Sequence, residues 1–275
     1  MSLYGLLAHP AGHSLSPIMQ NKLMRENHIN GYYHIFDVKP ENLISSVNGI
    51  RALNIDGFNV STPFKESIID LIDELTPLSN HLHTVNTVKN INGKLIGTTT
   101  DGDGFWQSIN PNQPHENVVI LGSGGSAKAV IATAHQYGVR NLSVYNRSHS
   151  DWSQRETMIS YLSHGIGQLF DLSDNQHMSY ALSNADLLIN ATTVGMNDSR
   201  MLLNDYQINL LPQHALVVDM IYRNKQTGLL RTAQRRHLAT QNGIPMLVSQ
   251  GALSFEYWFN QPANRQMMLE AIQGE

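Results

Sequence analysis

No cysteine occurs among the 275 residues of this sequence, so disulfides, thiol nucleophiles and cysteine–zinc sites are excluded. Basic clusters are also missing and the net charge at pH 7 is −4, so we expect neither nucleic acid nor a membrane as a partner. No apolar run approaches the roughly 18 residues of a transmembrane helix. No basic region precedes the apolar segment Leu3–Ala8, so a signal peptide is not expected. These absences favour a cytoplasmic protein.

Metal-binding patterns are missing as well. The 13 histidines, which include His81 and His83, lack the spacing of a zinc-binding helix. Asp101 and Asp103 are not followed by the glutamate that closes an EF-hand loop. We therefore predict no metal site, and a metal hydrolase is set aside.

The composition allows a folded protein with one large or two modest domains, because 41% of the residues are hydrophobic and 15% are charged. Strand and helix patterns alternate along the chain, which predicts the α/β class. Strands are expected over residues 3–8, 32–38, 57–60, 85–88, 94–97, 118–121, 142–145, 185–192 and 215–220, with a hairpin turn at Asn92-Gly93. Helices are expected over residues 18–27, 40–53, 66–75, 227–237, 253–259 and 264–272.

A glycine-rich turn lies near the middle of the chain, between the apolar run 118–121 and a helix-forming segment that ends near Gly138. Its residues are Gly122, Ser123, Gly124, Gly125, Ser126 and Ala127. In such a strand–turn–helix unit the first glycine permits a sharp exit from the strand, and the second lets a diphosphate approach the backbone. The helix would begin near Gly125 or Ser126, with its free N–H groups facing the phosphates. The turn therefore predicts a dinucleotide site.

The end of the next strand distinguishes the two nicotinamide cofactors. An NAD site has an acidic residue about 20 residues after the first glycine, whereas this chain has Asn146, Arg147 and Ser148. An arginine at this place can pair with the 2′-phosphate of NADP. Asp151 is the nearest acid, but it lies later in the loop. NADP is favoured, and NAD stays the alternative because no second basic residue follows Arg147 closely.

Polar residues also follow the strands expected in the first hundred residues. Ser14 and Ser16 lie where a helix begins, with Ser16 as its expected N-cap and Pro17 at the first helical position. Two hydroxyls at a helix start can also hold a small carboxylate. Lys65 follows a strand at the place where α/β folds bind ligands, although a solvated lysine is the ordinary alternative. A helix N-cap is the ordinary interpretation of Asp101.

Taken in order, the motifs resemble those of the shikimate dehydrogenase family. The segments similar to its substrate motifs are His13–Pro17, Asn59–Lys65, Val85–Thr87 and Thr100–Gly104. Those similar to its nucleotide motifs are Gly122–Ala127, Asn146–Ser148 and Asn190–Met196, and those similar to its closing segments are Asp219–Tyr222 and Met246–Gly251. The resemblance covers nearly the whole chain.

The resemblance implies an α/β fold of two domains with a cleft between them. Residues 1–104 plus 238–275 would form the substrate domain, and residues 105–237 a Rossmann-type NADP domain with a mostly parallel sheet. It also implies the reaction, which is the reversible reduction of 3-dehydroshikimate to shikimate by NADPH. The partner would be this small substrate, and the protein a monomer or homodimer.

The resemblance also implies residue roles. Lys65 and Asp101 would be catalytic. The substrate would be bound by Ser14, Ser16, Ser61, Lys65, Asn86, Asp101, Tyr222 and Gln250. The cofactor would be bound by residues 122–127, Asn146, Arg147, Ser148, Thr192, Met220 and Gly243.

Some positions depart from the family pattern, namely Ala8, Ser61, Thr99, Arg223 and Gly228. The alternatives are a quinate/shikimate dehydrogenase that uses NAD and a non-catalytic dinucleotide sensor. Lys65 and Asp101 are both present, which favours an enzyme over a sensor.

Overall fold

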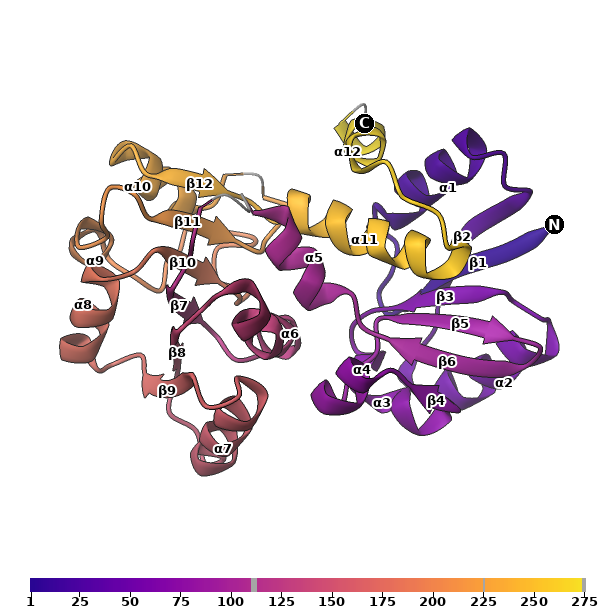
Figure 1. Ribbon diagram of the computed structural model, residues 1–275, viewed down its shortest axis with the longest axis horizontal. Coiled ribbons are helices and arrows are strands. Elements are labelled where there is room, and N and C mark those ends of the chain that lie inside the picture. The colour runs from indigo at the N-terminus through magenta and orange to yellow at the C-terminus, as the bar shows by residue number, and fades with distance from the viewer. Residues whose placement is uncertain (110–112, 225, 274–275) are drawn as a thin grey trace. The chain divides into compact units, whose positions relative to one another are not determined.

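The chain forms two units, each built around one sheet, in a computed structural model that describes residues 1–109, 113–224 and 226–273 (Figure 1). The first unit holds Met1–Gly104 and the segment that begins at Val248, and the second holds Phe105–Leu247. The two-domain α/β class expected from the sequence is confirmed. The return to the first unit falls at Val248 and not at the expected 238, because residues 239–241 form a strand of the second sheet.

The first unit has a mixed sheet of six strands in the order β2-β1-β3-β5-β6-β4. These strands are β1 (Ser2–Ala8), β2 (Gly31–Asp37), β3 (Gly57–Val60), β4 (Glu74–Leu75), β5 (Thr87–Ile91) and β6 (Lys94–Thr98). β1 pairs in parallel with β2 and β3, whereas β5 runs antiparallel to β3 and β6. The ends of β1 and β3 therefore lie at one edge of the sheet.

The hairpin between β5 and β6 confirms the turn expected from Asn92-Gly93. Ile91 pairs with Lys94, so the loop has two residues. Their φ angles are 54° at Asn92 and 88° at Gly93. A two-residue hairpin of this kind needs positive φ at both positions, which asparagine and glycine tolerate best.

Helices cover both faces of the first sheet, with α1, α11 and α12 on one side and α2, α3 and α4 on the other (Figure 1). Their bounds are α1 (Ser16–Glu26), α2 (Leu43–Ala52), α3 (Phe64–Ser67), α4 (Pro77–Leu82), α11 (Ile244–Phe259) and α12 (Arg265–Gln273), with 3-10 turns at η1 (Pro40–Asn42) and η2 (Ile69–Leu71). α2 turns Leu43, Val47 and Ile50 toward the sheet, at the spacing of one helical face.

Two helices expected in this unit are corrected. The helix expected over 66–75 is interrupted, because Ile72 is extended and Glu74–Leu75 pairs in parallel with β6. Sheet pairing has overridden local helix preference there. The helix expected over 253–259 begins earlier, at Ile244. Pro245 is tolerated because the first turn needs no N–H from it.

The second unit has a sheet of six parallel strands in the order β12-β11-β10-β7-β8-β9. Read from the first strand of the unit, this is the 3-2-1-4-5-6 order of the Rossmann fold. The strands are β7 (Asn117–Leu121), β8 (Asn141–Asn146), β9 (Gly167–Asp171), β10 (Leu187–Asn190), β11 (Leu216–Asp219) and β12 (Ala239–Gln241). The mostly parallel sheet expected for the nucleotide domain is confirmed.

The second sheet is also covered on both faces, with α6 and α7 on one side and α8, α9 and α10 on the other (Figure 1). The helices are α5 (Asp101–Ser108), α6 (Gly125–Thr133), η3 (Ala134–Tyr137), α7 (Trp152–Leu162), α8 (Asn175–Ser183), α9 (Asp205–Asn209) and α10 (Gly228–Arg235). The apolar residues of α8, α9 and α10 pack with β7, β8, β10 and β11 into one core. No helix in the described part of the chain is long and apolar enough to cross a membrane.

Candidate active site

A lysine–aspartate ion pair lies at the strand ends of the first unit. The Lys65 Nζ is 2.6 Å from the Asp101 Oδ2. Lys65 is carried by α3, just after β3, and Asp101 is the first residue of α5. Asp101 is only 6% exposed, and a buried carboxylate of this kind needs a charged or hydrogen-bonded partner. The two residues expected to be catalytic are therefore brought together.

Two further expected residues join this pair. The Asn86 Nδ2 donates to the Asp101 Oδ1 at 2.9 Å and lies 3.5 Å from the Gln250 Oε1. Asn86 directly precedes β5, and Gln250 lies on α11. Lys65, Asn86, Asp101 and Gln250 thus form one cluster, with residues from both ends of the chain.

The serines near the start of α1 are arranged differently from the expected cap. Ser16 is the first residue of the helix, and the capping position is Leu15, which makes no side-chain cap. The Ser14 Oγ accepts a hydrogen bond from the Ser16 N–H at 3.2 Å. The expectation that Ser16 is the N-cap is wrong, because the chain enters the helix one residue earlier. Ser61 lies directly after β3, and its N–H donates to the Leu7 carbonyl at 3.0 Å.

The glycine turn of the second unit follows β7 and opens α6, as expected. Gly122 has a φ of 101°, and a Cβ added there would lie 2.7 Å from the Thr192 Cγ2. Gly122 therefore packs against the loop after β10, which explains why that position needs glycine. A Cβ added at Gly124 or Gly125 would meet no atom within 4 Å. The turn has open space where a diphosphate would approach the N-terminus of α6.

A second arginine reaches this turn. The Arg155 Nη1 lies 3.2 Å from the Ser123 Oγ, and the Asn146 Nδ2 donates to the same oxygen at 2.7 Å. Arg155 lies on α7, and its Nε is held by the Asp151 Oδ2 at 2.8 Å. This hydrogen bond is the main reason why the pKa of Asp151 is lowered and that of Arg155 is raised. Arg147, beside them at the end of β8, is exposed.

Arg155 is not predicted from the sequence, because a cation for the 2′-phosphate is expected directly after β8, where Arg147 lies. The available signal was the spacing of Asp151 and Arg155, which are four residues apart and form an i,i+4 pair on one helix face. A cation on the helix after β8 is close enough to the glycine turn to contribute to the same anion site.

The ends of β10 and β11 are joined by a buried aspartate. The Asn190 Nδ2 donates to the Asp219 Oδ1 at 3.1 Å, and the Thr227 Oγ1 donates to the Asp219 Oδ2 at 2.7 Å. Burial raises the pKa of Asp219, and these hydrogen bonds oppose that effect. The Thr192 Oγ1 in turn donates to the Asn190 Oδ1 at 2.8 Å. Thr192 is thereby fixed beside the glycine turn.

Met220 and Gly243 lie against each other. A Cβ added at Gly243 would collide with the Met220 carbonyl oxygen. Tyr222 belongs to the second unit and follows β11, in the segment after Met220. Ser148 directly follows Arg147. Hydrogen bonds from Ser173 are the main reason why the pKa of Asp171 is lowered, and hydrogen bonds from Ser148 add to this effect.

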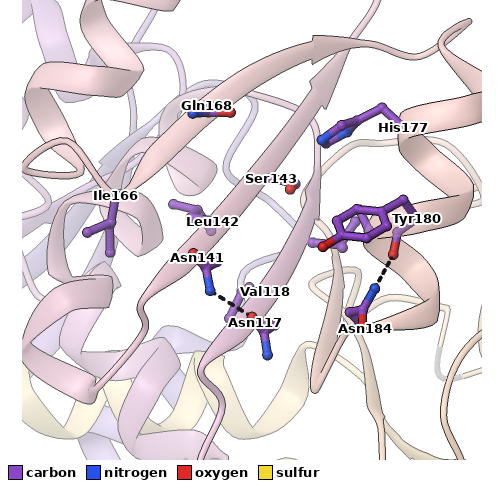
Figure 2. A pocket seen from close by; sticks show the side chains of 12 residues that line it. Asn117, Val118, Asn141, Leu142, Ser143, Ile166, Gln168, His177, Tyr180 and Asn184 are labelled. Carbon is purple, nitrogen blue, oxygen red and sulfur yellow. Dashed lines mark hydrogen bonds between the residues drawn. The ribbon is translucent and has the colours of Figure 1, made fainter.

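A hollow of about 340 Å³ lies where β7 and β8 of the second sheet begin (Figure 2). It is lined by the starts of β7 and β8 and by α8, with Asn117, Asn141 and Tyr180 among the side chains. Open parallel sheets bind ligands at the carboxyl ends of their strands, so this hollow is not the nucleotide site.

A Rossmann sheet with an open glycine turn, together with a separate α/β unit in which a half-buried lysine pairs with a buried aspartate, defines a dinucleotide-dependent oxidoreductase. Residues 6–88 match the model of the shikimate dehydrogenase substrate binding domain, and residues 243–273 match that of the shikimate 5′-dehydrogenase C-terminal domain. The chain belongs to the shikimate dehydrogenase family.

Individual relatives extend this similarity over almost the whole chain. The shikimate dehydrogenase (NADP+) of Latilactobacillus sakei is 42% identical over 272 residues, which cover 94% of this chain and 92% of that protein. The structure of shikimate 5-dehydrogenase from Listeria monocytogenes with shikimate and NAD has a TM-score of 0.91 and 31% identity, and the match covers 99% of this chain and 96% of that one. The structure of shikimate 5-dehydrogenase from Thermus thermophilus with NADP(H) and shikimate has a TM-score of 0.86 and 30% identity. This match covers 100% of this chain and 99% of that one.

Proposed function

We propose that this protein catalyses the reversible, NADPH-dependent reduction of 3-dehydroshikimate to shikimate, a step toward chorismate and the aromatic amino acids. The observation that carries the proposal is the 2.6 Å contact between Lys65 and Asp101, within a cluster that also holds Asn86 and Gln250. The relative from Latilactobacillus sakei is named for this activity, and two similar structures contain shikimate.

The chemistry of a ketone reduction explains why such a pair is needed. The nicotinamide supplies the hydride, and the protein positions the reactants. Negative charge develops on the carbonyl oxygen, so the Lys65 ammonium stabilises it and supplies the proton. Asp101 keeps the ammonium in place and accepts a hydrogen bond from the substrate hydroxyl.

The remaining residues of the first unit bind the substrate. Ser14 and Ser16, at the start of α1, hold the carboxylate, because a helix N-terminus favours an anion. Ser61, Asn86 and Gln250 contact the hydroxyls. Tyr222, from the second unit, supplies a further contact to the substrate.

The cofactor is NADP, bound by the glycine turn of the second unit. The open space at Gly124 and Gly125 receives the diphosphate, and Arg147 and Arg155 face the 2′-phosphate. Ser123, Ser126, Ala127, Asn146, Ser148, Thr192, Met220 and Gly243 complete the site. NAD stays the alternative, because one similar structure contains NAD.

An absorbance assay of nicotinamide reduction tests the function directly. Shikimate and quinate are each supplied with NADP+ and with NAD+. The expected result is that kcat/KM is highest for shikimate with NADP+. A higher value for quinate with NAD+ would support the alternative enzyme, and no turnover with any combination would leave only a dinucleotide-binding protein. The cytoplasmic location and the monomer or homodimer state stay predictions.

A further inference from the structure

A network of buried hydroxyl and carboxamide groups lies beneath the lysine–aspartate pair. Its members are Tyr33, Asn59, Asn86, Thr87, Thr100 and Ser254, each at most 7% exposed. They come from β2, β3, the start of β5, the segment before α5, and α11. A buried polar network is costly unless every member is paired, so its geometry is tightly constrained.

The Asn86 carboxamide has a fixed orientation in this network. Its Oδ1 accepts hydrogen bonds from the Thr87 hydroxyl at 2.9 Å and from the Thr100 N–H at 2.9 Å. A carboxamide oxygen can only accept, and the nitrogen can only donate. With Oδ1 occupied in this way, the Nδ2 group is directed to the Asp101 Oδ1 at 2.9 Å and to the Thr100 Oγ1 at 2.9 Å.

The Thr87 hydroxyl is itself oriented by Asn59. The Asn59 Nδ2 donates to the Thr87 Oγ1 at 3.0 Å and to the Ser254 Oγ at 2.9 Å. The Asn59 Oδ1 accepts from the Tyr33 phenol at 2.8 Å. The Thr87 Oγ1 also lies 2.8 Å from the Ser254 Oγ, and either hydroxyl can donate in that contact. When Ser254 donates to Thr87, the Thr87 proton goes to the Asn86 Oδ1, and the hydrogen bonds run from Tyr33 through Asn59 and Thr87 to Asn86.

The same segment also holds the backbone next to Lys65. The Val85 N–H donates to the Lys65 carbonyl at 2.8 Å. Asn86 and Thr87 follow directly, so the loop that carries Lys65 and the groups that orient Asp101 share one short stretch of chain.

We propose that Thr87 is a positioning residue of the dehydrogenase site, whose hydroxyl keeps the Asn86 carboxamide turned toward Asp101. The proposal rests on the proposed function, and it concerns a fully buried residue outside the proposed substrate and cofactor sites. Asn59 and Tyr33 act behind Thr87, by fixing which way its hydroxyl points.

The test compares two variants at this position. Thr87→Val keeps the shape and removes the hydroxyl, whereas Thr87→Ser keeps the hydroxyl. We expect Thr87→Val to lower kcat for shikimate oxidation roughly threefold to tenfold, in line with the loss of one neutral hydrogen bond. KM for NADP+ should not change, because the glycine turn belongs to the other unit. Thr87→Ser should stay within about twofold of the unmodified enzyme.

Ser79→Ala is the matched control, because Ser79 is fully buried in the same unit and its hydroxyl donates only to the Thr84 carbonyl, at 2.7 Å. It should lower the melting temperature about as much as Thr87→Val and leave kcat unchanged. An unchanged kcat in Thr87→Val, or an equal loss of kcat in Ser79→Ala or Thr87→Ser, would overturn the positioning role.

A second readout does not depend on turnover. The side-chain amide resonances of Asn86 should shift in Thr87→Val and keep their positions in Thr87→Ser and Ser79→Ala. If the unmodified protein turned over neither shikimate nor quinate, the proposed function would fail, while the amide resonances would still decide whether Thr87 orients Asn86. Unmoved resonances in Thr87→Val would contradict the proposal by themselves.

Discussion

At the scale of single residues, the role of the lysine–aspartate pair can be tested most sharply. Lys65→Ala should lower kcat for shikimate oxidation by roughly 10²–10⁴-fold, the usual range for a general acid. Asp101→Asn should lower it less, since an amide still forms hydrogen bonds but cannot balance an ammonium. If the residues act as one unit, the double variant should be scarcely worse than Lys65→Ala. NADPH affinity serves as the folding control, and a Lys65→Ala enzyme within about threefold of the original would remove Lys65 from the mechanism.

Cofactor preference is also decided by a few charges. Arg147→Ala and Arg155→Ala should each raise KM for NADP+ roughly tenfold or more and change KM for NAD+ little, because a charge-assisted hydrogen bond to the 2′-phosphate is lost. Asp151→Asn should lower KM for NADP+, since it removes the negative charge that pairs with Arg155.

The control for these charge changes is Arg140→Ala. Arg140 directly precedes β8, at the other end of the strand, and pairs with Glu116 at 3.3 Å. The Arg140→Ala substitution should leave the ratio of KM for NADP+ to KM for NAD+ unchanged. Equal effects of Arg155→Ala on both cofactors would mean that Arg155 contacts no 2′-phosphate.

At the scale of elements, two glycines of the glycine turn should have different roles, Gly122 in folding stability and Gly124 in cofactor binding. Gly122→Ala places a Cβ at a φ of 101° and 2.7 Å from Thr192. The left-handed backbone alone costs about 1–2 kcal/mol, so the melting temperature should fall by several degrees. Gly124→Ala meets no neighbouring atom, so it should leave the melting temperature unchanged and weaken NADP+ binding. Thermal unfolding and NADP+ titration of both variants distinguish the two roles, and a similar loss of stability in Gly124→Ala would contradict them.

Local patterns explain which elements could be predicted from the sequence. The glycine turn and the Asn92-Gly93 hairpin depend on residues next to each other, and both were found. Local preference predicts helix for Glu74–Leu75, which instead forms a strand, because its pairing partner β6 lies about twenty residues further along the chain. The contact between Lys65 and Asp101 was expected only from the family resemblance. Ser254 and Asn59 are 195 positions apart, and no local pattern indicates that they meet.

At the scale of the whole molecule, one buried histidine should make folding sensitive to acid. Burial lowers the pKa of His115, with nearby Asp186 opposing this effect. The folded protein therefore keeps His115 neutral, whereas the unfolded chain takes up a proton near the ordinary histidine pKa of about 6.5. The stability that depends on neutral His115 is present above that pH and is lost as the pH falls below it.

His115→Phe should remove this dependence. The melting temperature of the original protein should fall more between about pH 7 and pH 5 than that of the variant, around the ordinary histidine pKa. The difference in melting temperature between the two proteins, measured as a function of pH, gives the effect of His115 itself. A difference that stays constant over this range would show that His115 does not titrate on unfolding.

The first unit is assembled from both ends of the chain, and this has a consequence for synthesis on the ribosome. The Trp258 Nε1 donates to the Val88 carbonyl at 2.9 Å, and Ser254 bonds to Asn59. Asn59 and Val88 are synthesised long before α11, whereas residues 105–247 form one unit that is continuous in the sequence. Domains fold as units while the chain emerges. The second unit can therefore form early, whereas the first unit is closed only after α11 has been made.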